Sequence, residues 1–353
     1  MLTQRAHAFP TARALAGLLA AIVSQGIVSL GIVGLGIVGL GLATAARAQD
    51  DTASYPSRNI MLIVPYPPGG PPDVVARVLG PVLGDILGKP IVIENRPGAS
   101  TSIGAAAVAR AAPDGYTLLA SDIAQTVAPS ILVQPNFDPI KDFKHVGQTS
   151  VSVFTLDIDP KLPINTIGEF IAYARAKPGE IKVGHSGVGT PPHLGTLSVM
   201  QATGIEVLLV PYRGIAAAIQ DVVAGHIQMV TTAPSTAVGL AREGKVRMLA
   251  VSGAQRLTAM PDVPTFKESG IELKGFDKDN WFGISVPAAT PDAIVAKLDA
   301  AIHKAVLNSH AIDTLAKVEI KLVASSPQAF TGLIAQQVEA WRAVLKAAGV
   351  KPE

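Results

Sequence analysis

Residues 59–73 read N-I-M-L-I-V-P-Y-P-P-G-G-P-P-D, and this stretch decides the fold of the 353-residue chain. The apolar run 60–64 has the length and composition of a fully buried strand. A proline- and glycine-rich loop follows, and a helical pattern of apolar residues opens at Asp73. The stretch therefore predicts a strand, a tight loop and a helix, the repeating unit of an α/β protein.

The loop of this unit is a candidate anion site. A strand that enters a helix through a glycine turn presents backbone N–H groups at the positive end of the helix dipole. Pro71 and Pro72 have no N–H group, so Gly69, Gly70 and Asp73 remain as candidate binding residues. The spacings of nucleotide-phosphate loops are absent, which disfavours a nucleotide. A plain connection without a ligand fits the same pattern.

Composition excludes several classes of function. The 29 basic and 27 acidic residues nearly cancel, so the chain has no charge excess for binding nucleic acid or an acidic membrane surface. Cysteine is absent, which rules out disulfides, thiolate catalysis and thiolate metal sites. Aromatic residues make up only 5% of the chain, too few for a base-stacking surface. We expect no cofactor and no metal.

Residues 1–48 have the features of a secretory signal peptide. Arg5 and Arg13 are followed by an apolar, glycine-rich run and then by Ala46-Arg47-Ala48, an A-x-A end. Cleavage is expected after Ala48, which would release the protein into the periplasm. The apolar run is longer than the usual signal core, so a retained membrane anchor is the alternative.

Two sets of strand and helix patterns follow the signal. In the first set, strands at 91–94 and 116–120 flank an alanine-rich helix at 101–112, which predicts a parallel sheet covered on both faces. Ligands of such sheets bind at the carboxyl ends of the strands, which here adds Ser121 and Asp122 to the candidates.

The second set begins with a long apolar run at 146–158, which predicts a strand that leaves one sheet and enters another. Short strands and helices continue to residue 252, and residues 281–286 read as a strand that returns to the first sheet. The predicted fold is two α/β domains, 49–152 with 279–353 and 153–278, joined by two crossover strands. Such domains can close on a small molecule like a hinged clamp.

The loop at 184–193 is a second candidate site. It reads G-H-S-G-V-G-T-P-P-H and misses both the nucleophile elbow and the dinucleotide glycine pattern. Its hydroxyls and glycines precede a proline-started helix, so it fits either a second anion site or a tight loop. His185 and His193 have no carboxylate cluster between them, which disfavours a metal site.

The motifs along residues 55–353 resemble those of the Bug family, the periplasmic solute-binding components of tripartite tricarboxylate transporters. The resemblance rests on the following motifs, in this order: V-P-Y-P-P-G-G-P-P-D-V-V-A-R, I-V-I-E-N-R-P-G-A, A-A-P-D-G-Y-T-L-L, S-G-V-G-T-P-P-H-L, V-P-Y-R-G, P-S-T-A-V, P-D-V-P-T and A-A-G-V-K-P-E.

The resemblance implies a type II periplasmic-binding-protein fold with Venus-flytrap closure. It implies a small carboxylated solute as ligand, integral-membrane permease subunits as partners, and a monomer. It also implies that backbone N–H groups, hydroxyls and helix N-termini hold the carboxylate. The implied ligand-binding positions are Tyr66, Gly69, Gly70, Asp73, Ser121, Asp122, Ser186, Gly189, Thr190, His193, Pro234 and Ser235.

Three departures from the family pattern affect the choice of solute. Pro72 stands where many members have Thr or Ser, and residues 231–234 read T-T-A-P where members often have D-N-x-P. Residues 121–125, S-D-I-A-Q, differ from the usual small-residue loop, and Asp122 among them would repel a nearby carboxylate unless it points away or faces an amino group.

A solute-binding protein that is not an enzyme fits these features. The alternatives are a membrane-tethered sensor or receptor with the same clamp and a secreted hydrolase, although no motif supplies the nucleophile and base that a hydrolase needs. Asp73 is further expected to cap the helix that follows it and so to hold the loop.

Overall fold

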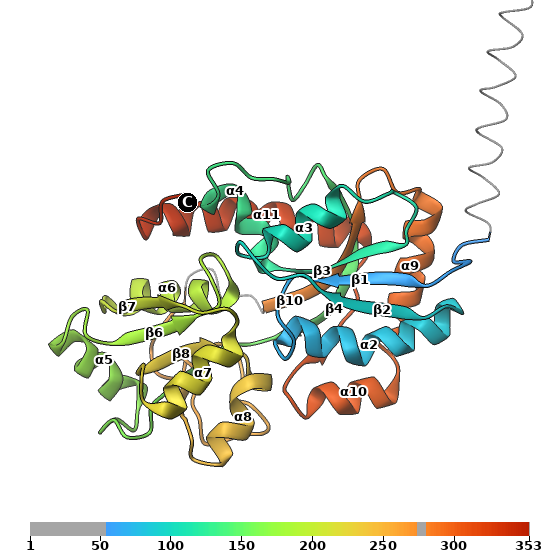
Figure 1. Ribbon diagram of the computed structural model, residues 1–353. Helices are drawn as coiled ribbons and strands as arrows, with labels where there is room; N and C mark the ends of the chain where they lie inside the picture. Colours follow the sequence, from blue (N-terminus) through green and yellow to red (C-terminus); the bar gives the residue numbers. More distant parts are fainter. Residues whose placement is uncertain (1–53, 274–279, 353) are drawn as a thin grey trace, which may run out of the picture. The chain divides into compact units, whose positions relative to one another are not determined.

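Two β-sheets, each covered by helices on both faces, organise the chain (Figure 1). The computed structural model describes residues 54–273 and 280–352, and the predicted signal peptide 1–48 lies outside them. Residues from Pro56 onward belong to one unit, separate from Met1–Tyr55. We refer to the six-stranded sheet with its helices as lobe 1 and to the five-stranded sheet with its helices as lobe 2.

Lobe 1 has the strand order β11-β4-β10-β3-β1-β2. β1 pairs in parallel with β2 and β3, whereas β10 runs antiparallel to β3 and β4. Figure 1 places α2, α9 and α10 toward one face and α3, α4 and α11 toward the other. Its elements are β1 (Ile60–Val64), α2 (Pro71–Leu87), β2 (Ile91–Asn95), α3 (Ser102–Ala109), β3 (Thr117–Asp122), α4 (Ile123–Ile131), β4 (Phe143–Ser152), β10 (Asn280–Pro287), α9 (Asp292–Ala305), α10 (Ser309–Ala316), β11 (Lys321–Leu322) and α11 (Pro327–Ala347).

Lobe 2 has the strand order β7-β6-β8-β5-β9, in which β6 is parallel to β7 and β8 and β5 is antiparallel to β8 and β9. Apolar residues of α5 and α6 pack on one face of this sheet, and those of α7 and α8 pack on the other. Its elements are β5 (Thr155–Ile158), α5 (Ile167–Ala176), β6 (Lys182–His185), α6 (Pro191–Thr203), β7 (Leu208–Pro211), α7 (Ile215–Ala224), β8 (Met229–Thr232), α8 (Pro234–Arg242) and β9 (Arg247–Val251).

The chain crosses between the lobes twice. On the first crossing only Val153 and Phe154 separate β4 from β5, so the predicted single strand at 146–158 is in fact two strands in two sheets. On the second crossing the chain leaves β9 and re-enters lobe 1 through β10, as the sequence predicted. The two-sheet α/β fold with two crossings is therefore confirmed, while the exact domain boundaries stay a prediction.

An apolar cluster brings both lobes together. It combines residues of α4, α11 and β10 in lobe 1 with residues of α6 in lobe 2 and with Phe154 of the first crossing. Its fully buried members are Ile123, Val127, Ile131, Phe154, Leu194, Leu197, Trp281, Phe330, Ile334, Trp341 and Leu345. We call this set the interlobe cluster.

Two helices were not predicted from the sequence. α4 follows β3 directly and is capped by Asp122, whose side chain accepts a hydrogen bond from the Ala124 N–H. Its interior Pro129 and apolar composition resemble a loop or strand more than a helix. The other is α10, which follows α9 closely and has Asn308 as its N-cap.

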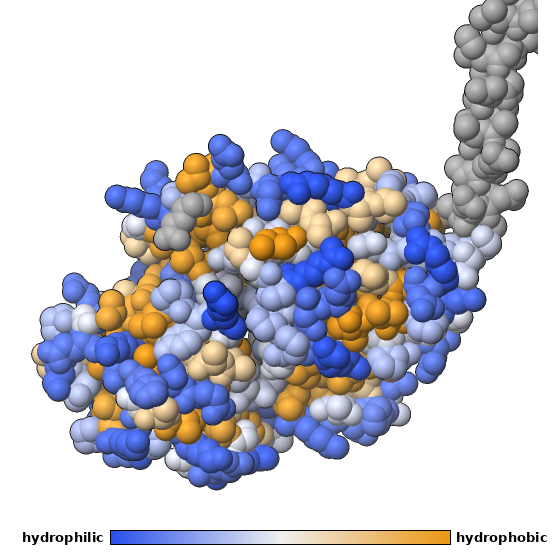
Figure 2. Space-filling view, viewed as in Figure 1, coloured by the Kyte–Doolittle hydropathy of each residue, from blue (hydrophilic) through white to orange (hydrophobic). Residues whose placement is uncertain are grey.

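The face of the molecule in Figure 2 is mostly hydrophilic, with hydrophobic residues in separate patches. Among the described residues, no helix combines the length and the apolar character needed to cross a membrane.

Candidate functional site

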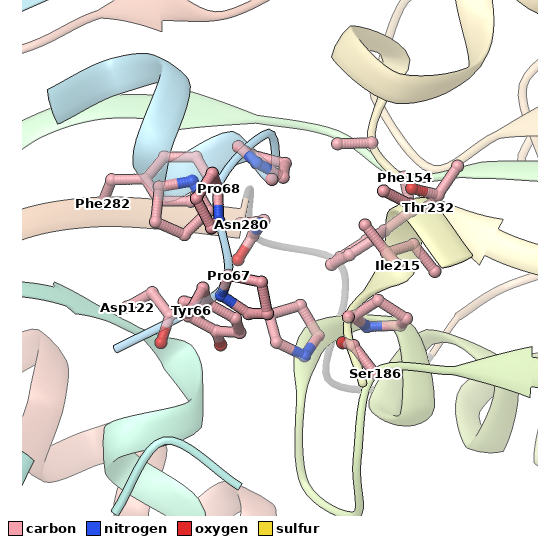
Figure 3. A pocket seen from close by; sticks show the side chains of 18 of the residues that line it. Tyr66, Pro67, Pro68, Asp122, Phe154, Ser186, Ile215, Thr232, Asn280 and Phe282 are labelled. Carbon is pink, nitrogen blue, oxygen red and sulfur yellow. Dashed lines mark hydrogen bonds between the residues drawn. The ribbon is translucent and has the colours of Figure 1, made fainter. Parts of the chain in front are cut away.

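A cavity lies between the lobes, where the carboxyl ends of β1 and β3 in lobe 1 meet those of β6, β7 and β8 in lobe 2. Its volume of about 60 Å³ has room for ~4–6 water molecules at ~10–15 Å³ each, so it fits a small solute. Figure 3 shows the two walls facing each other: Tyr66, Asp122, Asn280 and Phe282 from lobe 1, and Ser186, Ile215, Thr232 and the connector residue Phe154 on the other side.

Helix N-termini from both lobes point at this cavity. The first residues of α2 and α6 line it, as do Gly214 and Ile215 at the start of α7 and Ala233 at the start of α8. Each helix contributes the positive end of its dipole. These dipoles favour an anion in the cavity, and Arg213 in its lining adds a positive charge.

Prolines occupy the first positions of three of these helices, α2, α6 and α8. A proline here costs the helix little but removes an N–H donor. α7 is different, because its first residues are Ile215 and Ala216. The N–H groups of the first turn have no partner within a helix, so α7 is the best source of hydrogen bonds for an anion.

The start of α7 lies against the other lobe. Gly214 has φ +106°, and a Cβ at this position would lie 3.2 Å from Cγ of Pro67 in the loop after β1. The V-P-Y-R-G motif was recognised in the sequence, but Arg213, Gly214, Ile215 and Ala216 were not among the predicted site residues. The sequence feature that could have indicated them is Gly214, which precedes a helix that does not begin with proline.

Tyr66 and Asp122 form a buried pair at the edge of the cavity. The Tyr66 hydroxyl donates a hydrogen bond of 2.6 Å to Oδ2 of Asp122, and the Ala124 N–H donates to Oδ1. Burial raises the pKa of Asp122 to about 7, and these two hydrogen bonds oppose that shift. Each oxygen thus accepts a hydrogen bond, and the raised pKa favours the neutral carboxyl, which repels an anionic ligand less than an ionised one does.

Comparison with known proteins identifies the family to which this fold and cavity belong. The family model described as "Tripartite tricarboxylate transporter family receptor", TctC, matches residues 75–350. The chain belongs to the TctC family. Protein BugT of Bordetella pertussis (strain Tohama I) is 33% identical over 313 residues, which cover 88% of this chain and 95% of BugT.

Solved structures agree with this assignment. The periplasmic binding protein BugD has a TM-score of 0.80 at 30% identity, covering 85% of this chain and all of BugD. MatC (Rpa3494) of Rhodopseudomonas palustris, solved with bound malate, has a TM-score of 0.77 at 30% identity, covering 82% of this chain and all of MatC. The TctC-family fold and the resemblance to Bug proteins are therefore confirmed.

Four of the predicted site residues of this TctC-family protein line the cavity: Tyr66, Gly70, Asp122 and Ser186. The other eight are not in its lining: Gly69, Asp73, Ser121, Gly189, Thr190, His193, Pro234 and Ser235. Ligand contact by any of the twelve stays a prediction, and the structure gives several of the eight another role.

Asp73 holds the loop after β1. Its carboxylate accepts hydrogen bonds from the Gly69 N–H at 3.0 Å, from Nε of Arg77 at 2.9 Å and from Nδ2 of Asn95 at 2.8 Å. The helix begins at Pro71, and its N-cap is Gly70, so Asp73 is the third helical residue and not the cap. The predicted loop-holding role is thus performed from inside the first turn. Burial alone would raise the pKa of Asp73, but the hydrogen bonds outweigh it and lower the pKa.

Asp73→Ala is expected to destabilise the protein by on the order of 3 kcal/mol, because three donors lose a charged acceptor. Asp73→Asn should lose less, since its amide oxygen still accepts. Asp85→Ala, at an exposed position of the same helix, is the control for the loss of an acidic residue. Thermal and urea unfolding measure all three. Equal stability of Asp73→Ala and Asp85→Ala would contradict the loop-holding role.

The loop at 184–193 is stabilised mainly by its own hydrogen bonds. Ser186 donates to Thr190, Thr190 donates to the Gly187 carbonyl oxygen, and the Gly189 N–H donates to Nδ1 of His193. Burial lowers the pKa of His193 to about 3, with a further contribution from nearby His185. The neutral rings therefore act as acceptors for the loop backbone.

The remaining predicted residues, Ser121, Pro234 and Ser235, do not line the cavity. The Ser121 hydroxyl donates to Ser285 within the lobe 1 sheet. Pro234 and Ser235 begin α8, and the cavity is lined instead by the residues before them, Thr232 and Ala233. The described residues contain no cluster of three or more histidine, aspartate or glutamate side chains that could hold a metal ion.

Proposed function

We propose that this TctC-family protein is a periplasmic receptor that binds a small carboxylate between its lobes and delivers it to the permease of a tripartite tricarboxylate-type transporter. The observation that carries the proposal is the convergence of four helix N-termini, from both lobes, on one cavity. Because both lobes contribute, a bound anion stabilises the closed arrangement more than an open one.

The charges of the lining support an anionic ligand. Among the described residues that line the cavity, Arg213 is the one basic and Asp122 the one acidic side chain, and both oxygens of Asp122 already accept hydrogen bonds. The carboxylate bound by MatC supports the same class of ligand for this chain.

A hydrolase is the less favoured alternative. His145 and Ser285 are hydrogen-bonded at 2.9 Å, the kind of pair that could activate a serine. Both side chains are buried in the lobe 1 sheet and neither lines the cavity. We therefore propose a receptor without catalytic activity.

The proposal also covers export of the chain and its meeting with the permease. The signal peptide is cleaved after Ala48, and the released monomer meets the permease at the membrane. A membrane-tethered receptor would instead retain the apolar segment, and mass spectrometry of the exported chain distinguishes the two.

Binding of acids and of matched neutral amides tests the carboxylate proposal. We expect succinate or malate to raise the melting temperature with increasing concentration, whereas succinamide should not. Ala216→Pro removes one N–H at the cavity while keeping a residue type that first turns tolerate, and should weaken acid binding ~10- to 100-fold, since a hydrogen bond to a charged group contributes ~1.5–3 kcal/mol.

Ala217→Pro is the matched control, because Ala217 lies in the same first turn but outside the cavity lining. Equal stabilisation by acids and amides, or equal affinity of the two proline variants, would contradict the proposal.

A further inference from the structure

Two buried polar side chains at the cavity each have one oxygen atom without a hydrogen-bond partner among the described residues. They are Thr232, the last residue of β8, and Asn280, the first residue of β10. Thr232 is 1% exposed and Asn280 is 2% exposed, and Oγ1 of Thr232 and Oδ1 of Asn280 form no hydrogen bond within the described parts of the chain. Figure 3 shows the two side chains on opposite sides of the cavity.

The polar side chains opposite Asn280 and Thr232 in the sheets already have other hydrogen-bond partners. Ser152 is opposite Asn280 in the sheet, but its hydroxyl is directed at the carbonyl oxygens of Val153 and Glu319. Thr155 is opposite Thr232, but its hydroxyl lies against Asp157 and the backbone carbonyl of Thr232. The walls beside them are Phe154 and Phe282, which offer no hydrogen bonds. A buried polar group without a partner is unfavourable, so these two atoms are available to hydrogen-bond a group of the ligand.

We infer that Asn280 and Thr232 select a hydroxyl group on the bound solute, so that the solute is a hydroxy acid. The inference rests on the proposed carboxylate-binding function. A hydroxyl both donates and accepts, so one group can donate to Oδ1 of Asn280 and accept from the hydroxyl of Thr232. A second carboxylate cannot donate to Oδ1.

An amino group fits less well than a hydroxyl. A buried ammonium needs an ionised carboxylate partner. Asp122 is the acid among the described lining residues; its oxygens already accept hydrogen bonds from Tyr66 and the Ala124 N–H, and burial raises its pKa, so it is a poor partner for an ammonium. Neutral acceptors such as an amide and a threonine hydroxyl match a neutral donor.

Matched pairs of acids test this inference by calorimetry on the mature protein. The pairs are malate with succinate, lactate with propionate and mandelate with phenylacetate, and aspartate replaces malate to test the amino group. In the pair of the right size, the hydroxy acid is expected to bind ~10- to 100-fold more tightly than its deoxy partner, and aspartate should bind more weakly than malate.

Two variants assign the preference to these side chains. Thr232→Val preserves the side-chain shape and Asn280→Leu approximates it, and each should reduce the hydroxy-acid preference while leaving affinity for the deoxy acid nearly unchanged. Thr231→Val is the control. Its hydroxyl is hydrogen-bonded to Thr196 at 2.9 Å and does not line the cavity, so the preference should persist. Should Asn280→Leu not fold, Thr232→Val and the wild-type pairs decide alone.

The outcomes separate the inference from the proposed function. Deoxy acids that bind as tightly as hydroxy acids, tighter binding of aspartate than of malate, or an unchanged preference in Thr232→Val would overturn the inference while carboxylate binding stands. Failure of every acid to bind would overturn the proposed function, and the inference with it.

Discussion

Gly189→Val is expected to abolish ligand-induced closure and to reduce ligand affinity more than 100-fold. Gly189 has φ +75°, and a Cβ here would lie 2.5 Å from Cδ1 of Ile131 and 3.0 Å from Cγ2 of Val127. Both contacts are with α4 of the opposite lobe. The branched side chain of valine, with two γ-methyl groups, would therefore hold the lobes apart, and the first-turn N–H groups of α7 could no longer reach a solute held by lobe 1.

A valine at a second glycine, Gly204, is the control that distinguishes the effect of this contact from the effect of backbone strain. Gly204 ends α6 with φ +68°, and a Cβ there meets no atom within 4 Å. Gly204→Val thus carries a similar penalty for positive φ, ~1–2 kcal/mol, without the clash. We expect it to lower the melting temperature but to close normally in small-angle scattering with a ligand. If both variants bind and close alike, then the contact between Gly189 and α4 has no role in closure.

Asp157→Asn is expected to remove a large part of the pH dependence of stability. Asp157 is fully buried in β5, opposite Val230 and Met248 of the apolar face beneath α7 and α8. Burial raises its pKa to about 7, opposed by a hydrogen bond from Thr155. Between its unfolded pKa and about 7, the folded state holds the proton more tightly. Its contribution to stability is therefore fully present only below the unfolded pKa of ~4 and is lost as the pH rises from there through about 7.

The size of this effect is up to ~4 kcal/mol, at ~1.4 kcal/mol for each unit between the folded and unfolded pKa values. Asparagine stays neutral, so the variant should gain stability relative to wild type as the pH rises from 4 to 8. The difference between the two unfolding curves removes the opposite contributions of His145 and His193, whose pKa values burial lowers to about 4 and about 3.

Thr155→Val provides the opposite change. It removes the hydroxyl that stabilises the ionised form of Asp157, so it should lose further stability as the pH rises. A pH-independent difference between Asp157→Asn and wild type would show that Asp157 does not titrate in this range.

Periodicity in the sequence was sufficient to predict the layered α/β fold. The runs 60–64 and 91–94 form strands β1 and β2 with loops at their carboxyl ends, although only β1 is largely buried and Val92 of β2 is exposed. The break between β4 and β5 was not predictable, because Val153 and Phe154 are as apolar as the strands beside them. α4 was missed for a similar reason, since its cap and its packing against α11 outweigh an interior proline.

The candidate site was predictable at the level of loops but not of side chains. Glycines and prolines near residue 70 and near residue 190 marked two of the converging helices, and Tyr66, Gly70, Asp122 and Ser186 do line the cavity. Asn280 carried no local signal, because only the return of β10 to the first sheet brings it to the cavity. Asp73 looked like a cap, yet it bonds Arg77 one turn along the same helix and Asn95, which is brought to it only when β2 pairs with β1.

The interlobe cluster gives solute binding a calorimetric signature. Opening the lobes would expose apolar side chains of α4 and α6 that pack together in the closed arrangement, and closure would return them to the interior. Burial of apolar surface makes the heat capacity change of binding negative. A solute that fills a cavity of about 60 Å³ has little apolar area of its own to contribute. A large negative heat capacity change with a small hydrophilic acid would therefore measure the closing of the protein rather than the burial of the solute.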